Sequence, residues 1–227
     1  MLGAVIGDIC GSIYEHHNKK TDNLDEIRLL DPRGHFTDDT VLTIAVAEAC
    51  LSGREYLPAI QKWALRYPHA GYGSAFRRWL ATSDDQPYNS YGNGSAMRVS
   101  PLGWFCRTLE ETLVEARRSA EVTHNHPEGG KGTQAVGAAI FLAQNGASKS
   151  EIKSYIQESF QYDLERTVEQ IRPDYHFDSS CQGTVPEKNS KNSSLSPSSD
   201  ITNQKQPPKS GKEQLNNNMR YFLGSIL

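Results

Sequence analysis

Apolar positions along most of the chain recur every three or four residues, which is the spacing of an amphipathic helix. No segment shows the strict alternation of a half-buried strand, and the sequence contains no internal repeat. The pattern therefore predicts an all-α protein. The helices expected on this basis cover residues 40–51, 56–67, 108–120, 133–143 and 148–171.

Residues that cap or break helices support these limits. Gly53 follows the first predicted helix, and Tyr67-Pro68 ends the second because the residue before a proline disfavours helical backbone. Thr108–Glu111 and Ser148–Glu151 have the sequence of capping boxes. Residues 133–143 are small and apolar on nearly every face, so we expect this helix in the middle of a bundle.

Composition separates a domain from a tail. The chain has 227 residues and a formal net charge of −3, which argues against a polybasic nucleic-acid binder. Residues 188–218 contain no aromatic residue and only three larger aliphatic ones, so they cannot bury enough surface to offset the entropy of ordering. We expect a helical domain over residues 1–187 and a polar, disordered tail over residues 188–227.

The sequence also carries signals about location. No apolar run approaches the roughly 20 residues of a membrane helix, and the apolar start of the chain contains Asp8 and lacks a basic segment, unlike a signal peptide. Four scattered cysteines form no Cys-x-x-Cys pair, which is typical of reduced, buried thiols. We therefore expect a cytoplasmic protein without membrane contact. The cysteines are Cys10, Cys50, Cys106 and Cys181.

Loops rich in Gly, Asp, Asn and His lie between the predicted helices, and loops on a rigid scaffold are where ligand chemistry concentrates. One contains Thr37-Asp38-Asp39-Thr40 at the start of an apolar helix. These residues suit helix capping. Two adjacent carboxylates, however, repel each other, and a hard divalent cation such as Mg²⁺ or Mn²⁺ would relieve that repulsion. Both interpretations remain open at this point.

Two further loops admit a structural and a functional interpretation. Residues 91–98 form a Gly- and Asn-rich turn, and the same turn could expose backbone N–H groups to a phosphate while Asn93 and Ser95 bind sugar hydroxyls. His124 and His126 form a His-x-His pair without a third His or Cys ligand nearby, which favours a structural or polar-pocket role over a metal site.

Together these segments resemble the ADP-ribosylglycohydrolases, relatives of the dinitrogenase reductase-activating glycohydrolase. The matching segments are Gly-x-x-x-Gly-Asp-x-x-Gly-x-x-x-Glu at 3–15, Phe-Thr-Asp-Asp-Thr at 36–40, Gly-Asn-Gly-Ser-Ala-Met-Arg at 92–98 and Thr-His-x-His-Pro at 123–127. Segments 175–181 and 184–186 follow in the family's order. The resemblance covers about residues 1–187.

The resemblance implies an orthogonal multi-helix bundle with a two-metal centre, Mg²⁺ or Mn²⁺, at the bottom of an ADP-ribose cleft. Thr37, Asp38 and Asp39 match the family's N-terminal metal ligands, with Asp38 also catalytic, and Glu15 matches an acidic residue that could position or activate water. Residues matching the ligand-binding loop and pocket are Asn93, Gly94, Ser95, Met97, His124 and His126. The implied reaction is hydrolysis of the glycosidic bond between ADP-ribose and a modified protein or small molecule.

One family feature is missing. Family members complete the metal centre near their C-terminus with an Asp-x-Asp-Thr run, and none follows Glu187 here. We therefore expect a truncated or frameshifted copy, which leaves two hypotheses: an active hydrolase, or an inactive relative that retains partial metal or ADP-ribose binding. A helical interaction module with coincidental motifs is a third hypothesis.

Overall fold

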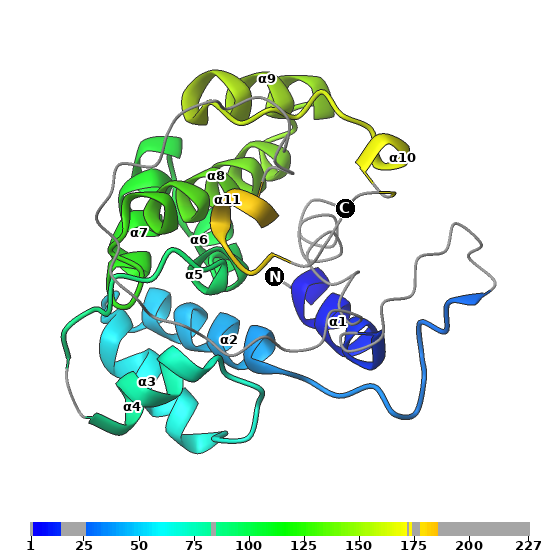
Figure 1. The fold of residues 1–227 in the computed structure, drawn as a ribbon. Helices are drawn as coiled ribbons and strands as arrows, with labels where there is room; N and C mark the ends of the chain where they lie inside the picture. Colours follow the sequence, from blue (N-terminus) through cyan, green and yellow to red (C-terminus); the bar gives the residue numbers. More distant parts are fainter. Residues whose placement is uncertain (1, 15–25, 83–84, 172, 174–177, 186–227) are drawn as a thin grey trace, which may run out of the picture.

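The computed structural model describes residues 2–14, 26–82, 85–171, 173 and 178–185, and these residues form a helical bundle (Figure 1). The all-α prediction is confirmed, since the only β pairing among the described residues is an isolated bridge between Gly92 and Ser180. The elements are α1 (Leu2–Gly11), η1 (Ser12–Tyr14), α2 (Asp38–Leu51), α3 (Tyr56–Arg66), α4 (Ser74–Thr82), α5 (Gly94–Met97), α6 (Ser100–Phe105), α7 (Leu109–Glu121), α8 (Pro127–Gln144), α9 (Lys149–Phe160), α10 (Val168–Ile171) and α11 (Cys181–Thr184).

Helix α8 forms the middle of one layer, in contact with α5, α6, α7, α9 and α11 (Figure 1). Its Ala135, Ala138 and Ala139 are buried against Ile152 and Ile156 of α9. Small side chains let neighbouring helices approach closely. The central position predicted for residues 133–143 is thus confirmed, although the helix begins earlier, at Pro127.

A second layer is built on α2, which packs against α1, α3, α5 and α6. Val41, Leu42 and Val46 of α2 meet Ile60 of α3 in the core of this layer, and each is at most 2% exposed. Farther along the chain, aromatic rings close the layer over α4. These rings are Tyr72, Phe76, Trp79 and Tyr88, each within 6.3 Å of the next between ring centroids.

The predicted capping residues do start their helices. Ser148 and Glu151 form a complete capping box at α9. Thr108 accepts a hydrogen bond from the Glu111 N–H at the start of α7, but the Glu111 carboxylate reaches back to the Arg107 N–H instead. Both helix starts therefore follow from local sequence.

The prediction that a helix continues from 148 to 171 is wrong. Helix α9 ends at Phe160, and Gln161 takes the left-handed conformation (φ 55°). Tyr162 is then 5% exposed and its ring stacks on Phe160, with ring centroids 6.4 Å apart. In a continuous helix, residues two positions apart, such as Phe160 and Tyr162, lie on nearly opposite faces. Burying both side chains together therefore requires the turn at Gln161.

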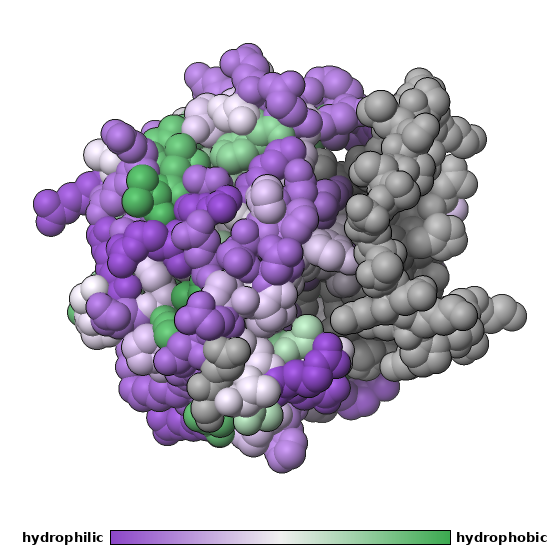
Figure 2. Space-filling view, turned by 60° about the vertical axis from the view of Figure 1, so that its left-hand side comes forward, coloured by the Kyte–Doolittle hydropathy of each residue, from purple (hydrophilic) through white to green (hydrophobic). Residues whose placement is uncertain are grey.

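The face in Figure 2 is largely hydrophilic, with hydrophobic areas between polar ones. Exposed apolar residues of α6 and α7 include Phe105 and Val114, at 41% and 53% exposure. Single exposed apolar residues are ordinary on a protein surface. Among the residues that the structure describes, no helix has the length and apolarity needed to cross a membrane.

Candidate functional site

The start of α2 is tied to α1 through a buried carboxylate. Asp8 is fully buried and accepts hydrogen bonds from the backbone N–H and the hydroxyl of Thr37, at 2.8 and 2.7 Å. It also accepts from the N–H and hydroxyl of Thr40, at 3.2 and 2.5 Å. Four donors converge on one carboxylate, which is the compensation a buried charge requires. Asp8 therefore fixes where α2 begins.

The acidic pair stands in the first turn of α2, where helix N–H groups favour negative charge. Thr37 is the N-cap, and its hydroxyl oxygen accepts from the Asp39 N–H at 3.3 Å and lies 3.2 Å from the Asp39 carboxylate. Asp38 and Asp39 are both partly exposed. The capping interpretation of this segment is confirmed, and it leaves the carboxylates accessible to solvent.

Oxygen donors of this type suit a hard cation, which can be held by one or two carboxylates while keeping several waters. The residues with defined positions contain no group of three or more His, Cys, Asp and Glu that could hold a metal ion. Binding of Mg²⁺ or Mn²⁺ by Thr37, Asp38 and Asp39, and the two-metal centre that the resemblance implies, stay predictions. Glu15, predicted beside this centre, lies outside the described residues.

A segment that the sequence analysis did not single out approaches the acidic pair. Gly71 has φ +100°, and a Cβ at this position would lie 3.6 Å from the Asp38 Oδ1 atom. Tyr72 follows at 3% exposure, and its hydroxyl has no hydrogen-bond partner among the described residues. Burial, assisted by the charge of Asp38, raises the pKa of Tyr72. The sequence feature that could have drawn attention to this segment is Gly-Tyr-Gly at 71–73.

The Gly-rich loop leads into α5, which packs against both α2 and α8. The Asn93 N–H donates to the Ser179 carbonyl at 2.7 Å, and its side-chain amide donates to the Thr184 hydroxyl at 3.2 Å. Hydrogen bonds therefore connect this loop to α11 and to the residues before α11. Figure 1 shows α1, the start of α2, α5 and α11 facing the same central region of the molecule.

The other predicted loop residues differ in what their side chains touch. Ser95 is fully buried, and its hydroxyl accepts from Thr133 at 2.6 Å in the contact between α5 and α8. Met97 is half-buried at the edge of the α2–α3 core. Gly94 lies over the His124 ring, because a Cβ there would come within 3.3 Å of Nε2. Substrate binding by these residues stays a prediction.

The two histidines of the His-x-His pair have different positions. His124 is 4% exposed, and burial, with the nearby charge of Arg98, lowers its pKa well below the ordinary value. His126 is the N-cap of α8, and its Nδ1 accepts from the Glu128 N–H at 3.1 Å. The rings of His126 and the exposed Tyr91 meet edge to face, with centroids 5.5 Å apart. A structural role for both is consistent with this geometry.

Helix α11 lies directly on α8. A Cβ on Gly132 would come within 2.6 Å of the Cys181 Sγ atom, so glycine permits this approach. The Cys181 thiol donates to the Gly92 carbonyl at 3.2 Å, and burial raises its pKa to about 12. All four cysteines are free. Cytoplasmic location, which reduced thiols favour, stays a prediction.

Comparison with known proteins identifies relatives. The sequence profile of the ADP-ribosylglycohydrolase family matches residues 1–213, which extends past the predicted domain boundary at 187. The ADP-ribosylhydrolase ARH3 of Homo sapiens is 28% identical over 183 residues, which cover 66% of this chain and 50% of the relative. The ADP-ribosylarginine hydrolase Tri1 of Pseudomonas putida (strain GB-1) is 26% identical over 175 residues, covering 66% and 47%.

A solved structure agrees with this grouping. The structure described as an ADP-ribosylglycohydrolase-related protein complex superposes with a TM-score of 0.61 and 25% sequence identity, over 81% of this chain and 70% of that one. The chain spans about half the length of the curated relatives that it matches.

Proposed function

The chain belongs to the ADP-ribosylglycohydrolase family, and we propose that it hydrolyses the glycosidic bond between ADP-ribose and a modified protein side chain or small molecule with the help of a divalent metal ion. The observation that carries the proposal is the placement of two family motifs on helices in contact. The acidic pair begins α2, and the Gly-Asn-Gly-Ser-Ala-Met loop forms α5, which packs on α2.

Thr37, Asp38 and Asp39 would hold the metal ion, through two carboxylates and one hydroxyl oxygen. When bound there, the ion would supply Lewis-acid chemistry, orienting the ribose hydroxyls and lowering the pKa of a bound water. The part played by the protein is to keep the acidic pair in place, which it does through the hydrogen bonds from Thr37 and Thr40 to Asp8. Asp38 would orient the attacking water by accepting its proton.

The ADP-ribose would lie across the 91–97 loop. Tyr91 is 55% exposed and its ring meets His126 edge to face, with centroids 5.5 Å apart, so the nucleobase would stack on this exposed ring. Gly92 and Gly94 carry no side chain, and glycine allows a phosphate or ribose to approach the backbone closely. Asn93 and Gly94 would contact the ligand here, while Ser95 and Met97 hold the turn against α8 and α2.

A second candidate is an ADP-ribose-binding relative that does not hydrolyse its ligand. It is favoured by one observation, the lack of a group of three metal-ligating side chains in the described part of the chain. Binding without turnover would follow if two carboxylates cannot orient the metal ion and water together.

Calorimetric titration with ADP-ribose tests the binding part of the proposal. Wild-type protein is expected to bind ADP-ribose more tightly than ribose 5-phosphate, because the adenine adds a stacking contact. Tyr91→Ala should weaken ADP-ribose binding about tenfold while leaving ribose 5-phosphate unchanged, since one base–aromatic stack contributes about 1–3 kcal/mol. Glu121→Gln, on the exposed end of α7, serves as the matched control. Equal binding of the two ligands would contradict the placement of the base.

A further inference from the structure

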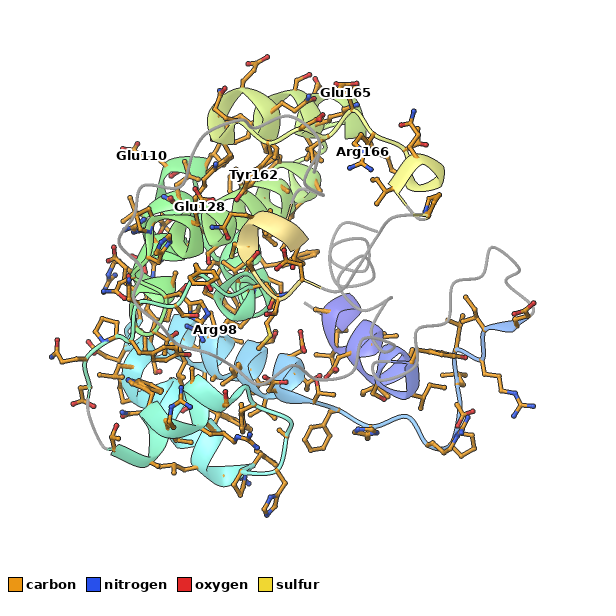
Figure 3. All side chains as sticks on the ribbon, in the orientation of Figure 1. Arg98, Glu110, Glu128, Tyr162, Glu165 and Arg166 are labelled. Atoms are coloured by element: carbon orange, nitrogen blue, oxygen red, sulfur yellow. The ribbon has the colours of Figure 1, made fainter. Side chains whose placement is uncertain are left out.

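Arg98 is an unusual residue of the molecule, because its guanidinium is buried at 1% exposure inside the bundle. It lies above α2 in Figure 3, between that helix and the α7–α8 pair. Its Nη2 donates to the Ser119 carbonyl at 3.1 Å and to the Thr123 hydroxyl at 3.0 Å. Its Nε has no partner among the described residues. Burial lowers the pKa of Arg98 to about 10, so the side chain stays charged at neutral pH.

Thr123 connects this cation to His124. Its hydroxyl lies 3.0 Å from the Arg98 Nη2 and 2.7 Å from the His124 Nδ1, and it also forms a hydrogen bond with the Tyr88 hydroxyl. A guanidinium can only donate, so the Thr123 oxygen must be the acceptor from Arg98. The single hydroxyl proton of Thr123 is then available to either His124 or Tyr88.

The chemistry of these two neighbours decides between them. A neutral imidazole nitrogen is a stronger acceptor than a phenol oxygen, and the Tyr88 hydroxyl carries its own proton, which it can donate to the second lone pair of Thr123. Accepting from a cation also polarises the Thr123 O–H and makes it a better donor. This arrangement satisfies every lone pair and proton of the Thr123 hydroxyl, with Nδ1 of His124 as the acceptor.

We propose that Arg98, acting through Thr123, fixes His124 as the tautomer protonated on Nε2, so that this N–H faces the backbone of the Gly92–Gly94 turn. The ring is placed for this role. A Cβ on Gly94 would lie 3.3 Å from the His124 Nε2 atom, and a Cβ on Gly92 would lie 3.7 Å from it. The imidazole is therefore packed against the turn. Arg98 and His124 are positioning residues for the loop, and the consequence for ADP-ribose binding rests on the proposed function.

Nitrogen NMR of the intact protein in the ligand-free state tests the tautomer directly. Protein labelled with ¹⁵N-histidine is recorded at neutral pH, and His124 is assigned by the signal lost in His124→Gln. The expected spectrum has an unprotonated Nδ1 and a protonated Nε2 for His124. A protonated Nδ1, or protonation of both nitrogens, would overturn the proposal, and this measurement needs no folded variant beyond the one used for assignment.

Two substitutions of Thr123 test whether Arg98 acts on His124 through this residue. Thr123→Ser keeps the hydroxyl and should keep the Nε2–H tautomer, whereas Thr123→Val removes the donor at nearly constant shape and should populate the Nδ1–H form. Arg98→Met should also mix the tautomers, because Thr123 loses the cation that directs its proton. An unchanged tautomer in a folded Thr123→Val protein would contradict the route through Thr123.

The effect on ligand binding is a separate readout. In calorimetry, Thr123→Val should weaken ADP-ribose binding about tenfold, which corresponds to the loss of one buried hydrogen bond. Thr123→Ser keeps the hydroxyl and should bind ADP-ribose as the wild-type protein does. Undiminished binding in Thr123→Val would overturn the role of His124 in positioning the turn. If the wild-type protein binds no ADP-ribose, the proposed function fails, while the tautomer measured in the free protein still decides the present inference.

Discussion

The carboxylate of Asp8 and the hydroxyl of Thr37 lie 2.7 Å apart, although 29 residues separate them in the sequence. Thr37 is the N-cap of α2, and its hydroxyl oxygen also accepts from the Asp39 N–H. The buried carboxylate of α1 therefore holds the end of α2 that presents the acidic pair. Stability and the geometry of the candidate metal centre depend on the same group.

Asp8→Asn should destabilise the protein by about 2–4 kcal/mol, because an amide nitrogen replaces one acceptor oxygen and leaves buried donors unpaired. Urea unfolding followed by circular dichroism measures the free energy of unfolding. The control is Glu121→Gln, which breaks an exposed ion pair with Arg117 and should change stability by less than about 1 kcal/mol. Equal effects of the two substitutions would contradict the role of Asp8.

Tyr72→Phe should leave the stability of the ligand-free protein unchanged or raise it by about 1 kcal/mol, since the hydroxyl it removes is buried without a partner in the described structure. Tyr56→Phe is the matched comparison, because that hydroxyl donates to Glu115 at 2.6 Å. Thermal unfolding of both variants is the measurement, and Tyr56→Phe is expected to lower the midpoint. A larger loss from Tyr72→Phe would show that its hydroxyl has a structural partner.

Gly132→Ala should loosen the contact between α11 and α8, because the added Cβ would lie 2.6 Å from the Cys181 Sγ atom. The Cys181 thiol is unreactive while buried, with its pKa raised to about 12, so its alkylation by iodoacetamide should become several-fold faster. Mass spectrometry of the labelled peptides gives the rate for each cysteine. Gly73→Ala, where an added Cβ meets nothing within 4 Å, should leave that rate unchanged.

The stability of the fold should fall as the pH drops below about 6.5, the ordinary pKa of histidine. Burial lowers the pKa of His124 in the folded state, so the unfolded chain takes up a proton in this range that the folded chain does not. The contribution is about 1.4 kcal/mol for each pH unit between the two pKa values. Denaturant titrations from pH 8 to pH 5 on wild-type protein and His124→Gln measure it, and parallel curves would contradict the burial of a neutral imidazole.

Features that depend on neighbouring residues could be predicted from the sequence. The capping box at Ser148, the end of α3 before Pro68 and the start of α2 near the Thr-Asp-Asp-Thr segment all follow from local propensities, and the structure confirms them within a few residues. The end of α9 could not be predicted, because the helical pattern continues past Gln161 and only the burial of Tyr162 on Phe160 requires the turn.

The features that could not be predicted from the sequence depend on contacts between segments that are distant in the sequence. Tyr72 beside Asp38 and Cys181 on Gly132 join segments that are 34 and 49 residues apart in the sequence. The Gly-Tyr-Gly sequence at 71–73 marks an unusual segment but does not say that it lies beside Asp38. The acidic pair and the 92–98 loop were recognised because their motifs carry the family pattern, and the contact between α2 and α5 brings them into one region. Metal binding by Thr37, Asp38 and Asp39 stays a prediction.

Release of ADP-ribose from ADP-ribosyl-arginine and ADP-ribosyl-serine peptides tests the proposed function most directly. The wild-type protein is assayed with Mg²⁺, with Mn²⁺ and with chelator, beside an Asp38→Asn/Asp39→Asn variant whose fold is checked by circular dichroism and the Glu121→Gln control. We expect release from at least one peptide that requires the metal ion and is lost in the double variant. Release that persists in chelator or in the double variant, or no release from folded wild-type protein, would contradict a metal-dependent hydrolase at the start of α2.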